Sequence, residues 1–369
     1  MIRASNTARD LARAVPWTLA VPALALVALA MTWGSHPANV VLLVLAVVLA
    51  GAVLASVHHA EVVAHRVGEP LGSLILAVAV TVIEVGLIVT LMASGGRETD
   101  SLARDTVFAA AMITCNGIVG LCIVVSTLRR RVATFNAEGT ATALATVIAL
   151  ATLCLVLPTF TTSSPGPTFS STQLAFAAIA SVGIYVLFVF VQNVRHRDFF
   201  LPPGGEPVTE DDHASAPTQQ ATMISLAALV ASLAAVIGLA KVESHGIEDA
   251  VDYLGAPQSA VGVVIALLVL LPETLAAYRN ARRDRLQTSF NLAYGSAVAS
   301  IGLTIPAVAV ASIWLSGSLV LGLDSLQITL LVLTAGIGAL SILPGRATLQ
   351  EGGLHLVIFA AFLVFALNP

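Results

Sequence analysis

Residues 72–94 read GSLILAVAVTVIEVGLIVTLMAS, an apolar run with one glutamate, Glu84, near its middle. A helix of about 20 apolar residues crosses the hydrocarbon core of a bilayer, which is roughly 30 Å thick. A charged side chain at that depth costs at least about 2.5–3.5 kcal/mol, so it needs a partner, a proton or a bound cation. The stretch therefore predicts a membrane-spanning helix that carries an ionisable group in its interior.

The composition of the whole chain agrees with a membrane protein. Of its 369 residues 57% are hydrophobic and 10% charged, and the mean hydropathy is +0.93. Soluble domains carry about 25% charged residues. The net charge of −4 comes without any basic block, so we expect the lipid bilayer as a partner and no nucleic acid. Cys115, Cys122 and Cys154 lack CxxC spacing and lie in apolar runs, which predicts packing residues.

Apolar runs long enough to span a membrane predict an all-α polytopic membrane protein with about eleven transmembrane helices. They lie near residues 16–33, 38–58, 72–94, 106–128, 140–160, 172–193, 222–241, 258–278, 288–315, 326–343 and 352–367. A stretch at 195–220, rich in Pro, Gly and acidic residues, separates six runs from five and predicts a linker. The first run follows three arginines and could instead be a signal peptide, although its length favours a spanning helix.

The distribution of basic residues predicts the orientation. With eleven spans, only Arg97, Arg104 and Lys241 of the 17 basic residues fall on the side opposite the N-terminus. Positive charge in short loops is retained in the cytoplasm. We therefore expect a multi-pass protein of the bacterial inner membrane with a cytoplasmic N-terminus and a periplasmic C-terminus.

Weak self-similarity relates the two halves of the chain. GEP at 68–70 and GAP at 255–257 each begin a run with one embedded glutamate, Glu84 or Glu273. At a constant offset along the sequence, three residues of the following run are also identical to their counterparts. Phe108 corresponds to Phe290, Gly120 to Gly302 and Leu121 to Leu303. An odd number of spans per repeat places the two halves in opposite orientations.

These matches predict four segments. They are 1–37, an N-terminal tail and extra helix; 38–193, a five-helix repeat; 194–221, an acidic cytoplasmic linker; and 222–369, a second, inverted five-helix repeat. Inverted repeats are typical of secondary transporters, whose sites lie near the membrane midplane where the repeats meet.

Glu84 and Glu273 are the predicted cation- and proton-binding residues. Glu273 directly follows Pro272, which leaves a carbonyl one turn earlier without its helix donor. Burial and a second nearby carboxylate both favour the protonated form of an acid, while a cation such as Ca²⁺ competes for the same oxygens. That competition predicts antiport. The alternative is that each glutamate is a protonated or hydrogen-bonded residue of helix packing.

Neighbouring polar residues could complete the cation shell. They are Thr81, Thr114, Asn116, Asn291, Ser296 and Ser300. Serine and threonine are also common packing residues in membrane helices, whereas buried asparagines are costlier and more informative.

The segment HHAEVVAHRVGE at 58–69 is a candidate cytoplasmic gate or cation sensor through His58, Glu61, His65 and Glu69. Glu61 and His65 are four residues apart on one helix face, which suits a metal or a pH-sensitive contact. An ordinary interfacial helix end is the alternative. A group of linker residues could sense cations or form a solvated charge run: Glu206, Glu210, Asp211, Asp212 and His213.

The stretches HHAEVVAHRVGEPLGSLILAVAVTVIEVGLIVTLM, LLPETLAAYRNA and FNLAYGSAVASIGLTIP resemble the bacterial ChaA-type antiporters of the calcium/cation antiporter (CaCA) superfamily. The resemblance implies an eleven-helix inner-membrane exchanger in which Glu84 and Glu273 are the central acids of the two repeats. Plant and yeast calcium/proton exchangers of the superfamily carry a Gly-Asn pair three residues before the glutamate. Here the corresponding stretches are VTVIE and VLLPE.

The favoured function is secondary active exchange of cytoplasmic Ca²⁺ for external H⁺ by alternating access. An Na⁺ or K⁺/H⁺ antiporter that uses the same acids is the alternative, followed by a passive cation channel. The motifs of intramembrane proteases, HExxH, GxSG and paired aspartates, are absent from the sequence. We therefore expect no enzyme and no cofactor, with Ca²⁺, H⁺ and alternatively Na⁺ or K⁺ as transported ions.

Overall fold

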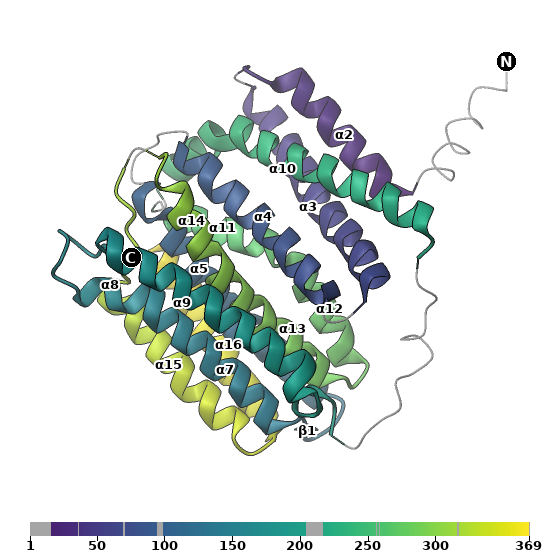
Figure 1. Ribbon diagram of the computed structural model, residues 1–369, viewed down its shortest axis with the longest axis vertical. Helices are drawn as coiled ribbons and strands as arrows, with labels where there is room; N and C mark the ends of the chain where they lie inside the picture. The colour runs from purple at the N-terminus through teal and green to yellow at the C-terminus, as the bar shows by residue number, and fades with distance from the viewer. Residues whose placement is uncertain are drawn as a thin grey trace. The chain divides into compact units, whose positions relative to one another are not determined.

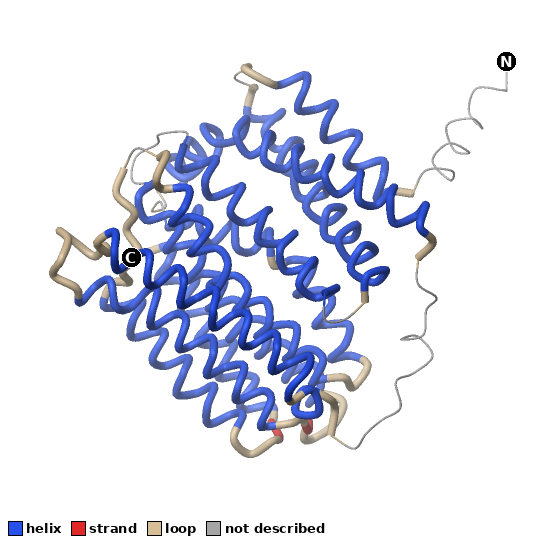
Figure 2. The backbone as a smooth tube through the Cα atoms, in the orientation of Figure 1, coloured by secondary structure: helices blue, strands red, loops and turns tan. Residues whose placement is uncertain are grey.

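The computed structural model describes residues 16–35, 37–68, 71–93, 99–203, 217–255, 257, 259–315 and 317–368. Glu69 and the five linker residues predicted as a cation sensor lie outside the described residues. Within the described part the chain is helical apart from its connections and one short two-stranded ladder (Figure 2).

Nine helical stretches of the described residues are long and apolar enough to cross a membrane. In chain order they are α3 (Asn39–Val67), α4 (Leu71–Ala93), the run α5 (Leu102–Met112), η2 (Ile113–Ile118) and α6 (Val119–Thr127), the run α7 (Ala137–Ala151), η3 (Thr152–Val156) and α8 (Leu157–Phe160), α9 (Ser171–Phe190) with η4 (Val191–Arg195), α10 (Gln219–Leu254), the run α13 (Leu286–Ala299), η7 (Ser300–Thr304) and α14 (Ile305–Ala311), α15 (Ser325–Ile342) and α16 (Leu349–Leu367). Segments η2, η3, η4 and η7 are π-helical.

Two further elements lie where the sequence predicted the remaining spans. Helices α11 (Ser259–Val269) and α12 (Leu271–Arg282) meet at a 52° bend and together count as one broken span. The shorter apolar helix α2 (Trp17–Thr32) comes first in the described chain. The predicted all-α polytopic membrane architecture is therefore confirmed.

Two helices run further than the apolar pattern indicated. Helix α3 continues beyond the predicted end at residue 58 and stops at Gly68, whose φ of +77° is a conformation that glycine adopts without strain. The segment from His58 to Val67 is thus the last part of a spanning helix. Helix α10 likewise continues past residue 241 to Leu254. Hydropathy alone could not show these extensions because polar residues continue a helix as well as apolar ones.

The chain divides into two compact units. Unit 1 comprises the residues up to Ile83 and residues 216–247, and so holds α2, α3, the first part of α4 and most of α10. Within it Ala60, Ala79 and Leu229 form a core where α3, α4 and α10 meet. The buried His59 donates a 2.8 Å hydrogen bond from Nε2 to the carbonyl of Thr18, which ties α2 to α3.

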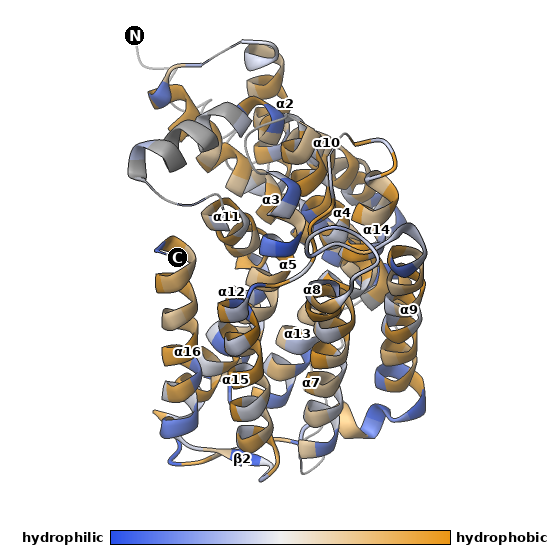
Figure 3. Cartoon of the chain, turned by 90° about the vertical axis from the view of Figure 1, so that its left-hand side faces the viewer, coloured by the Kyte–Doolittle hydropathy of each residue, from blue (hydrophilic) through white to orange (hydrophobic). Residues whose placement is uncertain are grey.

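Unit 2 comprises residues 84–215 and 248–369. The runs α5–η2–α6 and α13–η7–α14 include its two most buried spanning stretches. Helix α13 packs on α6, α7 and α12, and α16 packs along α6. Helices α7, α15 and α16 run side by side (Figure 1) and carry apolar residues along their length, with polar residues at the end near β2 (Figure 3).

Backbone hydrogen bonds close unit 2 at both ends of α7 and α15. At one end, strand β1 (Ala133–Thr134) pairs antiparallel with β2 (Arg346–Ala347). At the other end, the N–H of Leu323 donates to the carbonyl of Leu155 at 2.8 Å. Short 3-10 turns η1 (Thr99–Ser101) and η5 (Arg197–Phe200) cover connections of the same unit. These hydrogen bonds join the connections that flank α7 and α15.

Candidate functional site

Glu84 lies in the interior of unit 2 and is held by the run α13–η7–α14. Its side chain is 3% exposed, and its Oε1 accepts a 2.7 Å hydrogen bond from the hydroxyl of Ser300. The hydroxyl of the fully buried Thr304 lies near this carboxylate but makes no hydrogen bond to a described residue. Ser300 and Thr304 are four residues apart, so both side chains lie on one face of the segment. One carboxylate and two hydroxyls thus converge at this point.

The local sequence explains why the backbone of η7 departs from regular α-helix. Pro306 has no N–H, so the carbonyl of Gly302 has no α-helical donor. Gly302 also sits close to α9, because a Cβ added there would lie 3.0 Å from Cβ of Tyr185. A π-helical turn is a common feature of functional sites, since it redirects side chains and leaves backbone groups unpaired. The segment that contacts Glu84 is therefore irregular for identifiable reasons.

Glu273 occupies the first turn of α12, directly after the bend that separates α11 from α12. Its side chain is 9% exposed. Pro272 removes the donor for the carbonyl of Leu268, as the sequence predicted, and the helix breaks at Leu270. A helix N-terminus favours a carboxylate because the exposed N–H groups carry partial positive charge. The bend thus gives Glu273 a polar environment inside an apolar span.

Among the predicted auxiliary residues, only Ser300 has a described contact with Glu84. Thr81 is buried one turn before it on α4. The hydroxyl of Thr114 donates to the carbonyls of Ala110 and Ala111 at 2.7 and 3.0 Å, a bond within its own helix. Ser296 is half-buried on α13. These positions leave Ser300 as the auxiliary residue that the structure brings to the carboxylate.

The two predicted asparagines make contacts elsewhere in unit 2. Asn116 donates from Nδ2 to the hydroxyl of Thr334 at 2.9 Å, and its Oδ1 lies 3.2 Å from Nδ1 of His355. Asn291 donates from Nδ2 to the carbonyl of Phe200 at 2.7 Å and accepts from Gln287 at 2.9 Å. Since both amides are engaged in this way, we leave them out of the proposed cation shell.

The gate candidates lie on the last part of α3 in unit 1. Glu61 and His65 are exposed on the same helix face, as their spacing predicted, and His58 is half-buried against Trp17 with ring centroids 6.2 Å apart. Within the described ranges no three His, Cys, Asp or Glu side chains cluster to hold a metal ion. The role of these residues as a gate therefore stays a prediction.

The structure also shows polar residues inside the helices that sequence reasoning missed. Besides Thr304, they are Glu243 on α10 and His355 on α16, which are 5% and 1% exposed. The Oε1 of Glu243 has no hydrogen-bond partner among the described residues. Glu243 follows the apolar run that was assigned to its helix, and His355 is one polar residue in an otherwise apolar run. Scanning for every ionisable residue inside a helix would have found both.

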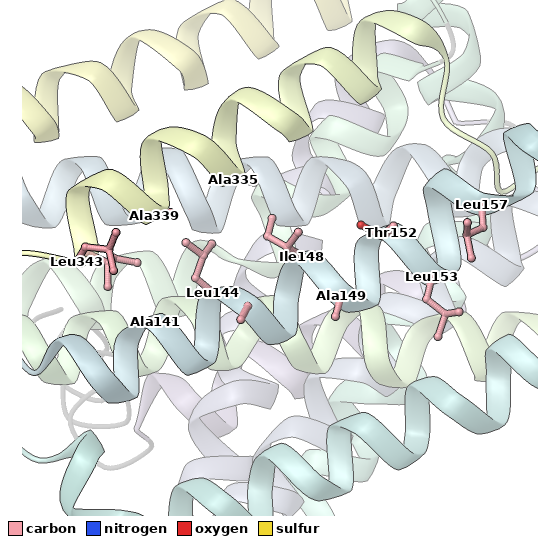
Figure 4. Close-up of a pocket in the computed structure, with 12 residues that line it drawn as sticks. Ala141, Leu144, Ile148, Ala149, Thr152, Leu153, Leu157, Ala335, Ala339 and Leu343 are labelled. Carbon is pink, nitrogen blue, oxygen red and sulfur yellow. The ribbon is translucent and has the colours of Figure 1, made fainter.

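The large cavity of unit 2 has the wrong chemistry for a cation site. It has a volume of about 600 Å³ and lies between α7 and α15, including η3 and α8 (Figure 4). Its lining is alanine, leucine and isoleucine, with Thr152 as the one polar residue. Such a surface offers no carboxylate to a cation. The polar environment of Glu84 is therefore the better candidate site.

Comparison with known proteins identifies the family of the chain. The sequence profile of the family described as "Sodium/calcium exchanger protein" matches residues 38–194 and 224–368. The chain belongs to this sodium/calcium exchanger family. Its resemblance to ChaA-type antiporters of the CaCA superfamily is confirmed as well: over 352 residues it is 32% identical to "Sodium-potassium/proton antiporter ChaA" of Escherichia coli (strain K12), covering 94% of this chain and 95% of that protein.

Other relatives of this exchanger-family chain agree in fold and extent. It is 44% identical to "Putative ionic transporter y4hA" of Sinorhizobium fredii (strain NBRC 101917 / NGR234), with 96% of each protein covered. The solved structure "Structure of native YfkE" matches with a TM-score of 0.71 at 16% identity over 96% of this chain and 99% of that one. "Crystal Structure of H+/Ca2+ Exchanger CAX" matches at 0.70 and 18% identity over 94% and 87%. These two structures show the shared fold.

Proposed function

We propose that this exchanger-family chain is a secondary transporter of the bacterial inner membrane that exports cytoplasmic Ca²⁺ in exchange for external H⁺. Glu84 and Glu273 are the binding residues, and each takes either a proton or a share of the cation. The observation that carries the proposal is the buried carboxylate of Glu84, held by the Ser300 hydroxyl of a π-helical turn in the interior of unit 2.

The groups around Glu84 explain how one site serves two ions. A carboxylate with two hydroxyls supplies oxygen ligands of the kind that Ca²⁺ prefers, and water or backbone carbonyls can complete the six to eight ligands that it takes. A proton on the same carboxylate makes the site neutral and displaces the cation. The ionised, empty site is the unfavourable state because it leaves an uncompensated charge inside the membrane. Movement between inward and outward access is therefore restricted to the loaded forms, which couples the two fluxes.

Glu273 supplies the second negative charge that a divalent ion requires. Glu273 lies in the first turn of α12, next to Pro272, and Pro272 leaves the carbonyl of Leu268 without its helix donor. Discontinuous helices of this kind bind ions in many transporters, because their unwound carbonyls coordinate cations. We therefore assign to Glu273 the same alternation between proton and cation as to Glu84.

Paired contacts support the proposal that the protein consists of two inverted repeats. Asp105 lies in the first turn of α5 and accepts a 3.3 Å hydrogen bond from Gln327 of α15. Gln287, which corresponds to Asp105 at the offset found in the sequence, begins α13 and donates to Thr140 of α7 at 3.4 Å. Each repeat thus joins its central helix to the next helix of the other repeat. The family profile matches two stretches that flank the linker, which also agrees with this division.

Antiport of Na⁺ or K⁺ against H⁺ is the second candidate. It is favoured by the 32% identity to a protein named "Sodium-potassium/proton antiporter ChaA". A carboxylate and two hydroxyls bind monovalent cations with the same oxygen atoms. The two candidates differ in the number of ionised carboxylates that they require. A divalent cation gains more electrostatic stabilisation from a second carboxylate than a monovalent cation does.

The test measures proton movement in everted membrane vesicles with an acidified interior. Ca²⁺, Na⁺ and K⁺ are added separately, and dissipation of the pH gradient is followed by fluorescence. We expect Ca²⁺ to dissipate the gradient with the wild-type protein and not with Glu84→Gln or Glu273→Gln. Glu138→Gln is the matched control, because Glu138 is exposed in the first turn of α7.

The outcomes separate the candidates. Dissipation by Ca²⁺ alone supports Ca²⁺/H⁺ exchange, and dissipation by Na⁺ or K⁺ supports the second candidate. Wild-type rates in Glu84→Gln or Glu273→Gln would remove that glutamate from the site. No response to any cation, with normal membrane levels of the protein, would contradict proton-coupled exchange.

A further inference from the structure

The apolar cavity of unit 2 takes no part in the proposed exchange mechanism. It has a volume of about 600 Å³ and is lined by α7 and its continuation, from Ala141 to Leu157, and by α15, from Ala335 to Leu343 (Figure 4). Ala145 and Ala339 lie on opposite walls and are exposed, so the cavity is open to the outside of the protein. We call it the α7–α15 groove.

Contacts in the middle and near both ends of the groove hold α7 and α15 at a fixed spacing. In the middle the helices touch at Gly338, where an added Cβ would lie 2.9 Å from Cδ2 of Leu144. Near the ends, β1 pairs with β2, and the N–H of Leu323 donates to the carbonyl of Leu155 at 2.8 Å. Because the helices already touch, they cannot close the groove by moving together. An unfilled groove loses dispersion contacts, so a ligand from outside stabilises it.

The chemistry and the dimensions of the groove suit one acyl chain. Both helices belong to the membrane-spanning stretches, so the medium around them is lipid. One leaflet contributes half of the hydrocarbon core, roughly 15 Å. The α15 wall is about 12 Å long at 1.5 Å per residue and covers most of that depth. An acyl chain that enters from the end at the β1–β2 ladder therefore fills the part of the groove that has both walls.

The end of the groove at the β1–β2 ladder carries positive charge. Arg346 lies in β2, three residues after the lining residue Leu343, and Arg131 lies two residues before β1. Both arginines are exposed, and neither forms an ion pair with a described residue. A guanidinium group binds a phosphate with two parallel hydrogen bonds. The two side chains are therefore placed to meet the phosphate of a lipid whose chain lies in the groove.

The acids at this end of unit 2 do not cancel the charge. Glu138 and Glu351 lie in the first turns of α7 and α16, where the exposed N–H groups of a helix compensate a carboxylate. Asp284 already pairs with Arg130 at 3.2 Å. Arg131 and Arg346 thus remain available for an anion from outside.

A second copy of the chain is a poorer occupant than a lipid. Copies in one membrane share an orientation, so a twofold contact across the groove would bring the arginines of both copies to the same end. Like charges would then face each other. A lipid phosphate instead neutralises them, and basic pockets between transmembrane helices are common sites for anionic headgroups.

We propose that the α7–α15 groove binds an anionic phospholipid, with one acyl chain between α7 and α15 and the phosphate at Arg346 and Arg131. The site is separate from Glu84 and Glu273, and it does not depend on the proposed function. With the predicted orientation the ladder lies at the cytoplasmic face, so the lipid belongs to the cytoplasmic leaflet.

The first test compares two lipids on the wild-type protein. The protein is delipidated in detergent and titrated with phosphatidylglycerol or with phosphatidylethanolamine of the same acyl chains, and bound lipid is counted by native mass spectrometry. We expect phosphatidylglycerol to bind more tightly by roughly fivefold for each arginine. Equal affinities for the two lipids would overturn the proposal.

Variants then separate the headgroup from the chain. We expect Arg346→Gln to weaken phosphatidylglycerol roughly fivefold and to leave phosphatidylethanolamine unchanged. The control is Arg283→Gln, because Arg283 is exposed on the connection between α12 and α13. Ala339→Trp fills the groove and should weaken both lipids, whereas Ala360→Trp, at an exposed position of α16 that does not line the groove, should weaken neither.

Unchanged lipid binding in Ala339→Trp would overturn the groove as the site. A dimer of the wild type that Ala339→Trp dissociates, with lipid binding unchanged, would assign the groove to a second copy instead.

A last measurement locates the lipid on the wild-type protein without any variant. Phosphatidylglycerol with a photoactivatable group on its acyl chain is crosslinked to the protein in vesicles, and the labelled peptides are identified by mass spectrometry. We expect label on residues 141–157 and 335–343, removed by an excess of unlabelled phosphatidylglycerol but not of phosphatidylethanolamine. Label that is spread evenly over the spanning helices would overturn a specific site.

Discussion

Ser300 is the residue whose contribution to the proposed cation site can be measured most directly, because its hydroxyl contacts Glu84 at 2.7 Å. Hydrogen bonds to charged groups are worth about 1.5–3 kcal/mol. Each 1.4 kcal/mol is a factor of ten in affinity. We therefore expect Ser300→Ala to raise the cation concentration for half-maximal exchange by roughly tenfold or more while exchange persists.

The measurement is the cation dependence of gradient dissipation in everted vesicles. Ser312→Ala is the matched control, because Ser312 lies at the C-terminal end of the same run and donates to the carbonyl of Ala309 at 2.8 Å. We expect the control to keep the wild-type cation dependence. An unchanged half-maximal concentration in Ser300→Ala would mean that its hydroxyl does not take part in cation binding.

Single residues could be predicted from the sequence only where their chemistry conflicts with their surroundings. Glu84 and Glu273 stand out because a carboxylate in an apolar run needs an explanation. The contacts of Asn116 and Asn291 could not be predicted, since their partners Thr334, His355 and Phe200 lie far away in the sequence. Residue type marks a polar position, but the fold decides which group it meets.

The bend between α11 and α12 is the element that distinguishes the environment of Glu273. Replacing Pro272 by alanine restores an N–H that can bond the carbonyl of Leu268 and straighten the 52° bend. We expect Pro272→Ala to lower the exchange rate by roughly an order of magnitude or more. A rise of about 1.4 kcal/mol in the activation free energy, caused by a misplaced Glu273, already slows exchange tenfold. The measurement is the exchange rate per amount of protein in the membrane.

Pro158→Ala provides a comparison within the same fold. Pro158 likewise interrupts a spanning run, since it lies in α8 after the π-helical segment η3, but that run carries neither Glu84 nor Glu273. We expect Pro158→Ala to retain exchange. Equal loss in both variants would indicate a general effect on folding and would contradict a specific role for the bend at Pro272.

Close helix packing in unit 2 depends on Gly262. A Cβ added there would lie 2.8 Å from the backbone nitrogen of Thr106, so α5 and α11 could not keep their spacing. Overpacking of this kind costs about 1–3 kcal/mol. We expect Gly262→Ala to lower the thermal unfolding temperature in detergent. Gly336→Ala is the control, since nothing lies within 4 Å of that position and alanine favours helix. A stable Gly262→Ala variant would show that the two helices can separate at little cost.

The elements were largely predictable from hydropathy, but their ends and interruptions were not. Apolar runs mark where a helix crosses the membrane. They do not mark where α3 and α10 stop, because a helix continues through polar residues until a residue such as Gly68 ends it. The π-helical turn η7 has a local signal in Pro306 and Gly302, whereas its contact with Glu84 depends on how the run α13–η7–α14 packs on α4.

At the scale of the whole molecule, the predicted orientation follows from the number of spans and the distribution of basic residues. The loop that holds Arg131 precedes α7, and the loop that holds Thr162 follows α8, so the run from α7 to α8 separates them by about 36 Å at 1.5 Å per residue. The two loops lie at opposite ends of unit 2 (Figure 1). With a cytoplasmic N-terminus, Arg131 faces the cytoplasm and Thr162 the periplasm.

Single cysteines at these positions test the orientation against a low background. The native Cys115, Cys122 and Cys154 are at most 2% exposed, so a membrane-impermeant maleimide should react with them slowly. We expect Thr162→Cys to be labelled in spheroplasts and Arg131→Cys to be labelled only in everted vesicles, since both positions are exposed. The reversed pattern would invert the predicted topology. It would then place the start of α16 on the periplasmic side.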